Sequence, residues 1–260
     1  MNSKFLILII SVFTVLYSCK KDDKTYQNDS MVEFSKNEDL VIIPFSEKNT
    51  ITLPIKVQLN SKAYGIDKNI QIVESDTNSV SHRKYYTLNN KTILLADSIF
   101  AIFYVQIQSK NFNENESITI NFIFSDSSQI SPAKNYNKFT LIIKKQSFQE
   151  VFIGKYLCSE PVNQDLYTTQ FIPGTLANTI KNTNFWNFPA DGQTVEYTIS
   201  KDSTMAVEIV EQDWVDKSGQ DYKISGKGTY DFNGNLIVNY SVFKNGLLYE
   251  EGTHTFNPLK

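Results

Sequence analysis

Most of this chain alternates apolar and polar residues, and that alternation limits its fold more than any other feature. The clearest run has apolar side chains at every second position: Ile51, Leu53, Ile55, Val57 and Leu59. A period of two is that of a β-strand, whose successive side chains point to opposite faces. Pro54 lies inside this run and has no N–H to donate, so we expect an edge strand or a bulge there.

Residues 31–145 contain short runs of this kind, separated by polar turns. The expected strands are residues 32–34, 40–45, 51–59, 69–74, 92–96, 100–108, 118–124 and 139–143. Seven to nine short strands over such a length, with no helical stretch of ten or more residues, indicate a β-sandwich.

A second set of strands follows over residues 146–260. The expected strands are residues 151–159, 166–172, 179–188, 194–200, 206–212, 222–230, 236–243 and 247–256. Asp191-Gly192, Asn233-Gly234 and Asn245-Gly246 are turn sequences that favour tight hairpins. Eight strands joined in this way form an up-and-down meander, which is enough to close a small barrel.

The first 18 residues have the pattern of a secretory signal. Lys4 supplies a positive charge, and the apolar run at residues 5–17 follows it. As a helix this run would be about 20 Å long, too short to cross a hydrocarbon core of about 30 Å. We therefore exclude residues 1–18 from the fold and expect them to be removed.

Residues 16–19, Leu-Tyr-Ser-Cys, resemble the lipobox of bacterial lipoproteins, which implies lipidation of Cys19. The next four residues resemble the signal that directs Bacteroidota lipoproteins to the outer face of the outer membrane: Lys20, Lys21, Asp22 and Asp23. Residues 19–30 are polar and would form a lipidated tether, so the chain would be anchored rather than spanning. The alternative is ordinary secretion with Cys19 as a free thiol.

Composition argues against several classes of function. With 25 basic and 28 acidic residues, the formal net charge of −3 does not suit a protein that follows nucleic-acid phosphates. Two histidines and two cysteines leave little material for metal sites, and we predict no cofactor and no metal. We expect His82 and His254 to be solvated or at the edge of a core, and Cys158 to be a small buried side chain. No catalytic motif is present, so we predict no enzyme activity.

Four residues are candidates for contact with a ligand. Trp214 lies in the most acidic stretch, residues 211–221, where we expect an exposed hairpin loop. Its ring would stack on a sugar or fold back over the barrel end. Strand alternation would place the other three candidates on one face: Asn184, Trp186 and Phe188. That face would be a binding platform, or Trp186 would be the packed centre of the barrel.

Residues 154–156, Gly-Lys-Tyr, resemble the opening of lipocalin-like barrels. Residues 178–188 and 226–231 resemble the C-terminal domain of Bacteroidota surface lipoproteins encoded beside SusC/SusD-type uptake systems. This resemblance implies an immunoglobulin-like sandwich over residues 31–145 and a lipocalin-like barrel over residues 146–260. It also implies an accessory protein on the cell surface.

We therefore expect a non-enzymatic, outer-membrane lipoprotein facing the cell exterior. It would bind a glycan or another nutrient, and SusC/SusD-like proteins are candidate partners. Two alternatives are a structural or adhesive module that binds a protein and a lipocalin-type carrier with a cavity inside the barrel. If bulky side chains fill the barrel, the lipocalin-type carrier is excluded.

Overall fold

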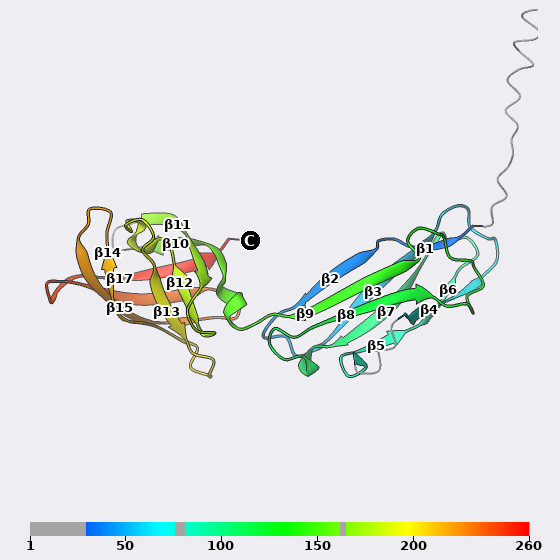
Figure 1. Cartoon of the computed structure of the whole chain (residues 1–260), viewed down its shortest axis with the longest axis horizontal. Helices are drawn as coiled ribbons and strands as arrows, with labels where there is room; N and C mark the ends of the chain where they lie inside the picture. Colours follow the sequence, from blue (N-terminus) through cyan, green and yellow to red (C-terminus); the bar gives the residue numbers. More distant parts are fainter. Residues whose placement is uncertain (1–29, 76–81, 162–164, 260) are drawn as a thin grey trace, which may run out of the picture.

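The computed structural model describes residues 30–75, 82–161 and 165–259, and it confirms the all-β fold. Figure 1 shows two β structures at opposite ends of the molecule, a sandwich of two sheets and a closed eight-stranded barrel. The predicted signal peptide, Cys19 and the predicted export signal at residues 20–23 lie outside the described residues.

The sandwich consists of a four-stranded and a five-stranded sheet. The four-stranded sheet has the order β1 (Val32–Phe34), β3 (Thr50–Leu59), β7 (Phe100–Gln108) and β5 (Tyr86–Asn89). The five-stranded sheet has the order β2 (Glu38–Ile43), β9 (Lys138–Lys145), β8 (Ser117–Phe124), β4 (Lys68–Glu74) and β6 (Lys91–Leu94). Strands β2 and β9 are parallel, and the other described pairs are antiparallel. A short 3-10 helix, η1 (Ser109–Asn111), follows β7.

Alternation builds the core of the sandwich as expected. Along β7, Phe103, Val105 and Ile107 point into the core and are buried. Pro54 lies in the part of β3 that pairs with β7 alone, because β1 pairs with β3 only from Val57 onward. Strand β5 was not expected from the sequence, since its four residues include Thr87 and Asn89 and give too short a pattern.

The barrel is an up-and-down meander in which each strand is antiparallel to the next and the last pairs with the first. Its strands are β10 (Gly154–Glu160), β11 (Asp165–Pro173), β12 (Thr179–Asn182), β13 (Val195–Ile199), β14 (Ala206–Val215), β15 (Asp221–Tyr230), β16 (Leu236–Lys244) and β17 (Leu247–Pro258). Two short 3-10 helices accompany them, η2 (Gln149–Phe152) before β10 and η3 (Phe185–Asn187) after β12.

The barrel has an apolar end and a polar end. At the apolar end the rings of Phe148, Phe152 and Tyr230 pack together, with Phe152 and Tyr230 centred 5.1 Å apart. Phe45 of the sandwich packs against Phe148 at 5.2 Å, so the apolar end is the one that meets the sandwich. Helix η3 and the hairpins β14–β15 and β16–β17 lie at the other end, where most of the predicted ligand residues gather.

One predicted strand was wrong beyond its first residues. The extended structure expected over residues 179–188 ends with β12 at Asn182, and η3 follows. Asn182 Oδ1 accepts a hydrogen bond from the Asn184 backbone N–H at 2.8 Å, which turns the chain. The strand alternation inferred for Asn184, Trp186 and Phe188 therefore does not exist.

Candidate functional site

Trp214 is buried inside the barrel, contrary to the expectation of an exposed loop. It lies in β14 with 0% of its surface exposed, and its ring packs at 5.6 Å from Phe185. The reason is a β-bulge: Val210 and Glu211 together face one residue of β15, since Ile209 pairs with Gly226 and Gln212 with Ile224. One extra residue exchanges the two faces of a strand, so Trp214 points inward.

The turn at η3 holds its backbone in an unusual conformation. Trp186 and Asn187 have φ of 60° and 52°, in the left-handed region that residues other than glycine rarely adopt. Side chains fix this turn: Asn184 Nδ2 donates to Thr168 O at 3.0 Å, and Trp186 Nε1 donates to Glu250 Oε1 at 2.7 Å. Strain held by specific contacts is typical of binding sites.

Four aromatic side chains, which we call the aromatic end cluster, lie at this end of the barrel: Trp186, Phe188, Tyr222 and Tyr249. The rings of Trp186, Tyr222 and Tyr249 contact one another, whereas Phe188 is held at this end by its backbone oxygen, which accepts from the Lys217 N–H at 3.1 Å. The Trp186 ring is 5.8 Å from Tyr222 and 6.0 Å from Tyr249, and both contacts are edge-to-face. Phe188 is 46% exposed and Tyr249 is 56% exposed, so part of the cluster faces solvent. Trp186 and Phe188 thus lie at one end of the barrel, and their role as ligand residues stays a prediction.

Tyr249 owes its position to a second bulge. Val242 of β16 pairs with Glu250 and Phe243 pairs with Leu248, which leaves Tyr249 as the extra residue at the barrel rim. Bulges at barrel rims change the direction of a side chain. Lys244 Nζ lies 5.9 Å from the centre of the Tyr249 ring, a cation–π contact that further fixes the tyrosine.

Beneath the aromatic residues lies an inner polar cluster of Glu160, Tyr240, Glu250 and His254. Glu160 and His254 are each 1% exposed, and Glu160 Oε2 lies 3.5 Å from His254 Nε2. The Tyr240 hydroxyl contacts Glu160 Oε1 and lies 2.8 Å from Glu250 Oε1. Gly252 makes room for this hydroxyl, because a Cβ at that position would overlap it. Since Glu250 also accepts from Trp186, the cluster connects the barrel interior to the η3 turn.

The sequence did not point to this inner cluster, and it placed His254 wrongly. His254 lies inside the barrel and is 1% exposed, with its ring centre 4.4 Å from that of Tyr240, rather than at a core edge. A signal was present: alternation from the buried Phe256 puts His254, Gly252 and Glu250 on the same inner face of β17. Glu160 lies on the inner face of β10 in the same way.

Large side chains fill the barrel interior. The fully buried ones include Trp214, Tyr156, Tyr197, Tyr240, Phe171 and Phe185. Burial raises the pKa of Tyr156, Tyr167 and Tyr197, so their hydroxyls stay protonated at neutral pH. Such filling counts against the lipocalin-type carrier considered from the sequence. Cys158 is buried among them, as expected.

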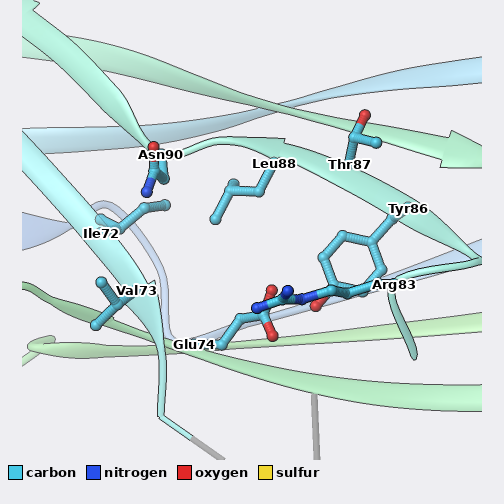
Figure 2. Close-up of a pocket in the computed structure, with 8 residues that line it drawn as sticks. All are labelled: Ile72, Val73, Glu74, Arg83, Tyr86, Thr87, Leu88 and Asn90. Carbon is cyan, nitrogen blue, oxygen red and sulfur yellow. The ribbon is translucent and has the colours of Figure 1, made fainter. Parts of the chain in front are cut away.

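The sandwich has a pocket of its own, at the open side between β4 and β5. It has a volume of about 490 Å³ and is lined by Ile72, Val73, Glu74, Arg83, Tyr86, Thr87, Leu88 and Asn90. Figure 2 shows the Arg83 guanidinium and the Glu74 carboxylate pointing toward one another beside the Tyr86 ring. Within the described residues, no three His, Cys, Asp or Glu side chains gather as a metal site would require.

The fold and these sites define an all-β protein whose barrel holds hydrogen-bonding side chains and displays aromatic rings at one end. No protein-family model matches the chain, and no curated protein matches it. Among the described residues, no helix is long and apolar enough to cross a membrane.

Two solved structures from Bacteroides show weak similarity to this chain. One is a protein of unknown function from Bacteroides ovatus, with 9% identity, a TM-score of 0.41 and coverage of 87% of this chain and 89% of the other. Another is an auxiliary nutrient binding protein from Bacteroides thetaiotaomicron, with 8% identity, a TM-score of 0.36 and coverage of 85% and 90%. Because these TM-scores are below 0.5, function is inferred from the sites alone.

Proposed function

We propose that this chain is a non-enzymatic lipoprotein of the bacterial cell surface that binds a glycan at the polar end of its barrel. The observation that carries the proposal is the aromatic end cluster, in which exposed rings of Phe188 and Tyr249 adjoin a strained turn. Aromatic faces stack on the apolar face of a sugar ring, and nearby amides and carboxylates bind its hydroxyls. Asn184, Asn187 and Glu250 supply such polar groups around Trp186.

The four residues predicted from the sequence take different roles in this proposal. Phe188 and the half-buried Trp186 would contact the ligand, and Asn184 would hold the turn through its bond to Thr168. Trp214 would support Trp186 from below, since their rings lie 5.8 Å apart and Trp214 is buried. The site is thus a platform on the rim rather than a cavity within the barrel.

Membrane attachment through Cys19 belongs to the same proposal. The lipobox-like residues 16–19 and the basic-acidic residues 20–23 support it, and they would place the protein on the outer face of the outer membrane. SusC/SusD-like uptake proteins would be its partners there. Metabolic labelling with a fatty-acid analogue tests the anchor, and labelling that persists in Cys19→Ala would contradict it.

A binding screen tests the glycan site. We expect residues 20–260 to be retarded in native gels that contain the recognised polysaccharide, with a change in tryptophan fluorescence because Trp186 lies at the site. Tyr249→Ala should weaken binding at least about 10-fold, the range of aromatic contacts at binding hot spots. Tyr104→Ala is the matched control, since Tyr104 is an exposed aromatic residue of the sandwich. Equal loss in both variants, or none in either, would sink the site assignment.

A second candidate function is the binding of a partner protein. Leu247 and Leu248 at the β16–β17 hairpin are exposed beside Tyr249, and Leu247 is 74% exposed. Exposed aliphatic side chains beside an aromatic residue suit a protein interface better than a sugar. A screen with no glycan hit, together with loss of a protein partner in Leu247→Asp, would favour this function.

A further inference from the structure

The pocket of the sandwich contains the only arginine of the chain. The whole chain has 25 basic residues, of which 24 are lysines and one is Arg83. Arginine differs from lysine in presenting a planar fork of N–H donors that matches the two oxygens of a carboxylate. Arg83 is therefore the one position of the chain at which such a fork is available.

The pocket has a charged end and an aliphatic side. Arg83, Glu74 and Tyr86 form the charged end, and Figure 2 places Ile72, Val73 and Leu88 along the remaining wall. The Ile72 backbone N–H donates to Asn90 O at 3.0 Å, which continues the pairing of β4 with β6 to the residue where the chain passes from β5 to β6. A volume of about 490 Å³ is within the range of small-molecule sites.

Two polar atoms at the charged end of this pocket lack a hydrogen bond of normal geometry. Glu74 Oε2 and the Tyr86 hydroxyl are buried, and neither has a hydrogen-bond partner within the described part of the chain. In those same residues Arg83 has no carboxylate oxygen within 4.0 Å, although it faces Glu74. Tyr86 is 3% exposed, and burial, followed by the nearby Glu74, raises its pKa. Its hydroxyl therefore stays protonated and can donate. Buried polar groups without partners are costly, and a ligand can supply the missing bonds.

We propose that this pocket binds a free α-amino acid with an aliphatic side chain. The carboxylate of the amino acid would accept from Arg83 and from the Tyr86 hydroxyl. Its ammonium would donate to Glu74 Oε2. Its side chain would lie against Ile72, Val73 and Leu88. The charges of the pocket and of the amino acid are complementary. The pocket presents one positive group, the Arg83 guanidinium, and one negative group, the Glu74 carboxylate. A zwitterionic amino acid presents one carboxylate for the first and one ammonium for the second.

Other small ligands fit this pocket less well. A sugar acid brings a carboxylate for Arg83 but no cation, so it would add a second negative charge beside Glu74. A simple amine would satisfy Glu74 and repel Arg83. A neutral sugar would leave both charges unpaired and would meet aliphatic rather than aromatic walls. This inference concerns the sandwich and does not depend on the glycan site of the barrel.

Titration calorimetry with L-leucine at pH 7 tests the proposal on residues 20–260. We expect saturable binding that weakens at least about 10-fold for N-acetyl-L-leucine, which lacks the ammonium, and for L-leucinamide, which lacks the carboxylate. Glu74→Gln, Tyr86→Phe and Arg83→Lys should each weaken binding of L-leucine. The lysine variant keeps the charge and loses only the fork.

Lys91→Gln is the matched control, because Lys91 is an exposed basic residue of β6 that does not line the pocket. Circular dichroism would establish that each variant is folded. No heat with L-leucine would overturn the proposal. So would equal affinity for L-leucinamide or for galacturonate, and so would an unchanged affinity in Arg83→Lys.

Discussion

The sandwich and the barrel are built from strands with the same alternation, yet their interiors differ in chemistry. The buried core of the sandwich is made of aliphatic and Phe side chains, with Tyr85 and Tyr86 as its buried phenols. The barrel interior holds His254, Glu160 and Asn182 as well as tyrosines and Trp214. An apolar core needs only packing, whereas buried polar groups must also find hydrogen-bond partners.

This difference determines where each part can bind a ligand. In the sandwich, two of the polar atoms without partners, Glu74 Oε2 and the Tyr86 hydroxyl, lie at the open side between β4 and β5, and a third, Ser109 Oγ, lies in η1. In the barrel, polar groups run from the interior to the rim through Glu160, Tyr240 and Glu250. The barrel thus connects its core to its candidate site through polar side chains, whereas the sandwich does so through Ile72 and Tyr86, which belong to its core and also line the pocket.

The largest expected effect is on the packing of the sandwich. Phe103 is fully buried in the central strand β7, and Phe103→Ala should lower the free energy of unfolding by about 3–5 kcal/mol through lost burial and a cavity. Phe100→Ala on the same strand is the control, because Phe100 is exposed and should cost about 0.5 kcal/mol or less.

Both tryptophans lie in the barrel, so tryptophan fluorescence follows the barrel and circular dichroism follows both parts. Urea unfolding of Phe103→Ala should shift the circular dichroism transition and leave the fluorescence transition in place. An equal shift in both signals would show that the two parts unfold as one unit and would remove this contrast between them.

The buried Glu160–His254 pair of the barrel should give the next largest effect. Glu160→Leu leaves His254 and Tyr240 without their buried partner, and we expect a loss of about 3 kcal/mol in the fluorescence transition. The double variant Glu160→Leu/His254→Leu removes both members of the pair and should recover most of that loss. If Glu160→Leu unfolds at the same urea concentration as the unaltered protein, the Glu160–His254 pair contributes nothing to the free energy of unfolding.

Ionisation of the Cys158 thiol should have the smallest effect on the free energy of unfolding near neutral pH. Burial raises the pKa of its thiol to about 12, against a hydrogen bond from Tyr167 that lowers it. Below about pH 8 the thiol is almost fully protonated in both states, so this group adds no pH dependence there. As pH rises from about 9 to about 12 the unfolded state ionises first, and stability falls.

Reaction with an aromatic disulfide at pH 8 measures the same property directly. The thiolate fraction in the folded chain should be about 1,000-fold smaller than in guanidinium, the ratio given by pKa values of 12 and 9. The reaction should therefore be very slow until the protein is denatured. Rapid labelling of the folded chain would show that the barrel around Cys158 opens.

The sequence predicted much of the fold because nearly every strand shows the alternation of apolar and polar residues. Prediction from alternation fails where an extra residue shifts the strand register. The bulge at Val210 and Glu211 reverses the faces of β14, so Trp214 is buried although its neighbours in sequence are acidic. The turn at η3 depends on the Asn182 amide and on left-handed φ values at Trp186 and Asn187. No local sequence pattern predicts either of these features.

By itself, the sequence determined that this protein is all-β and that a meander follows a sandwich. Those conclusions rest on local periodicity and turn chemistry, which neighbouring residues encode. Only the tertiary structure decided which faces are buried and which side chains meet. The Glu160–His254 pair and the Arg83 pocket join residues far apart in the chain, and barrel closure, bulges and sheet packing bring them together.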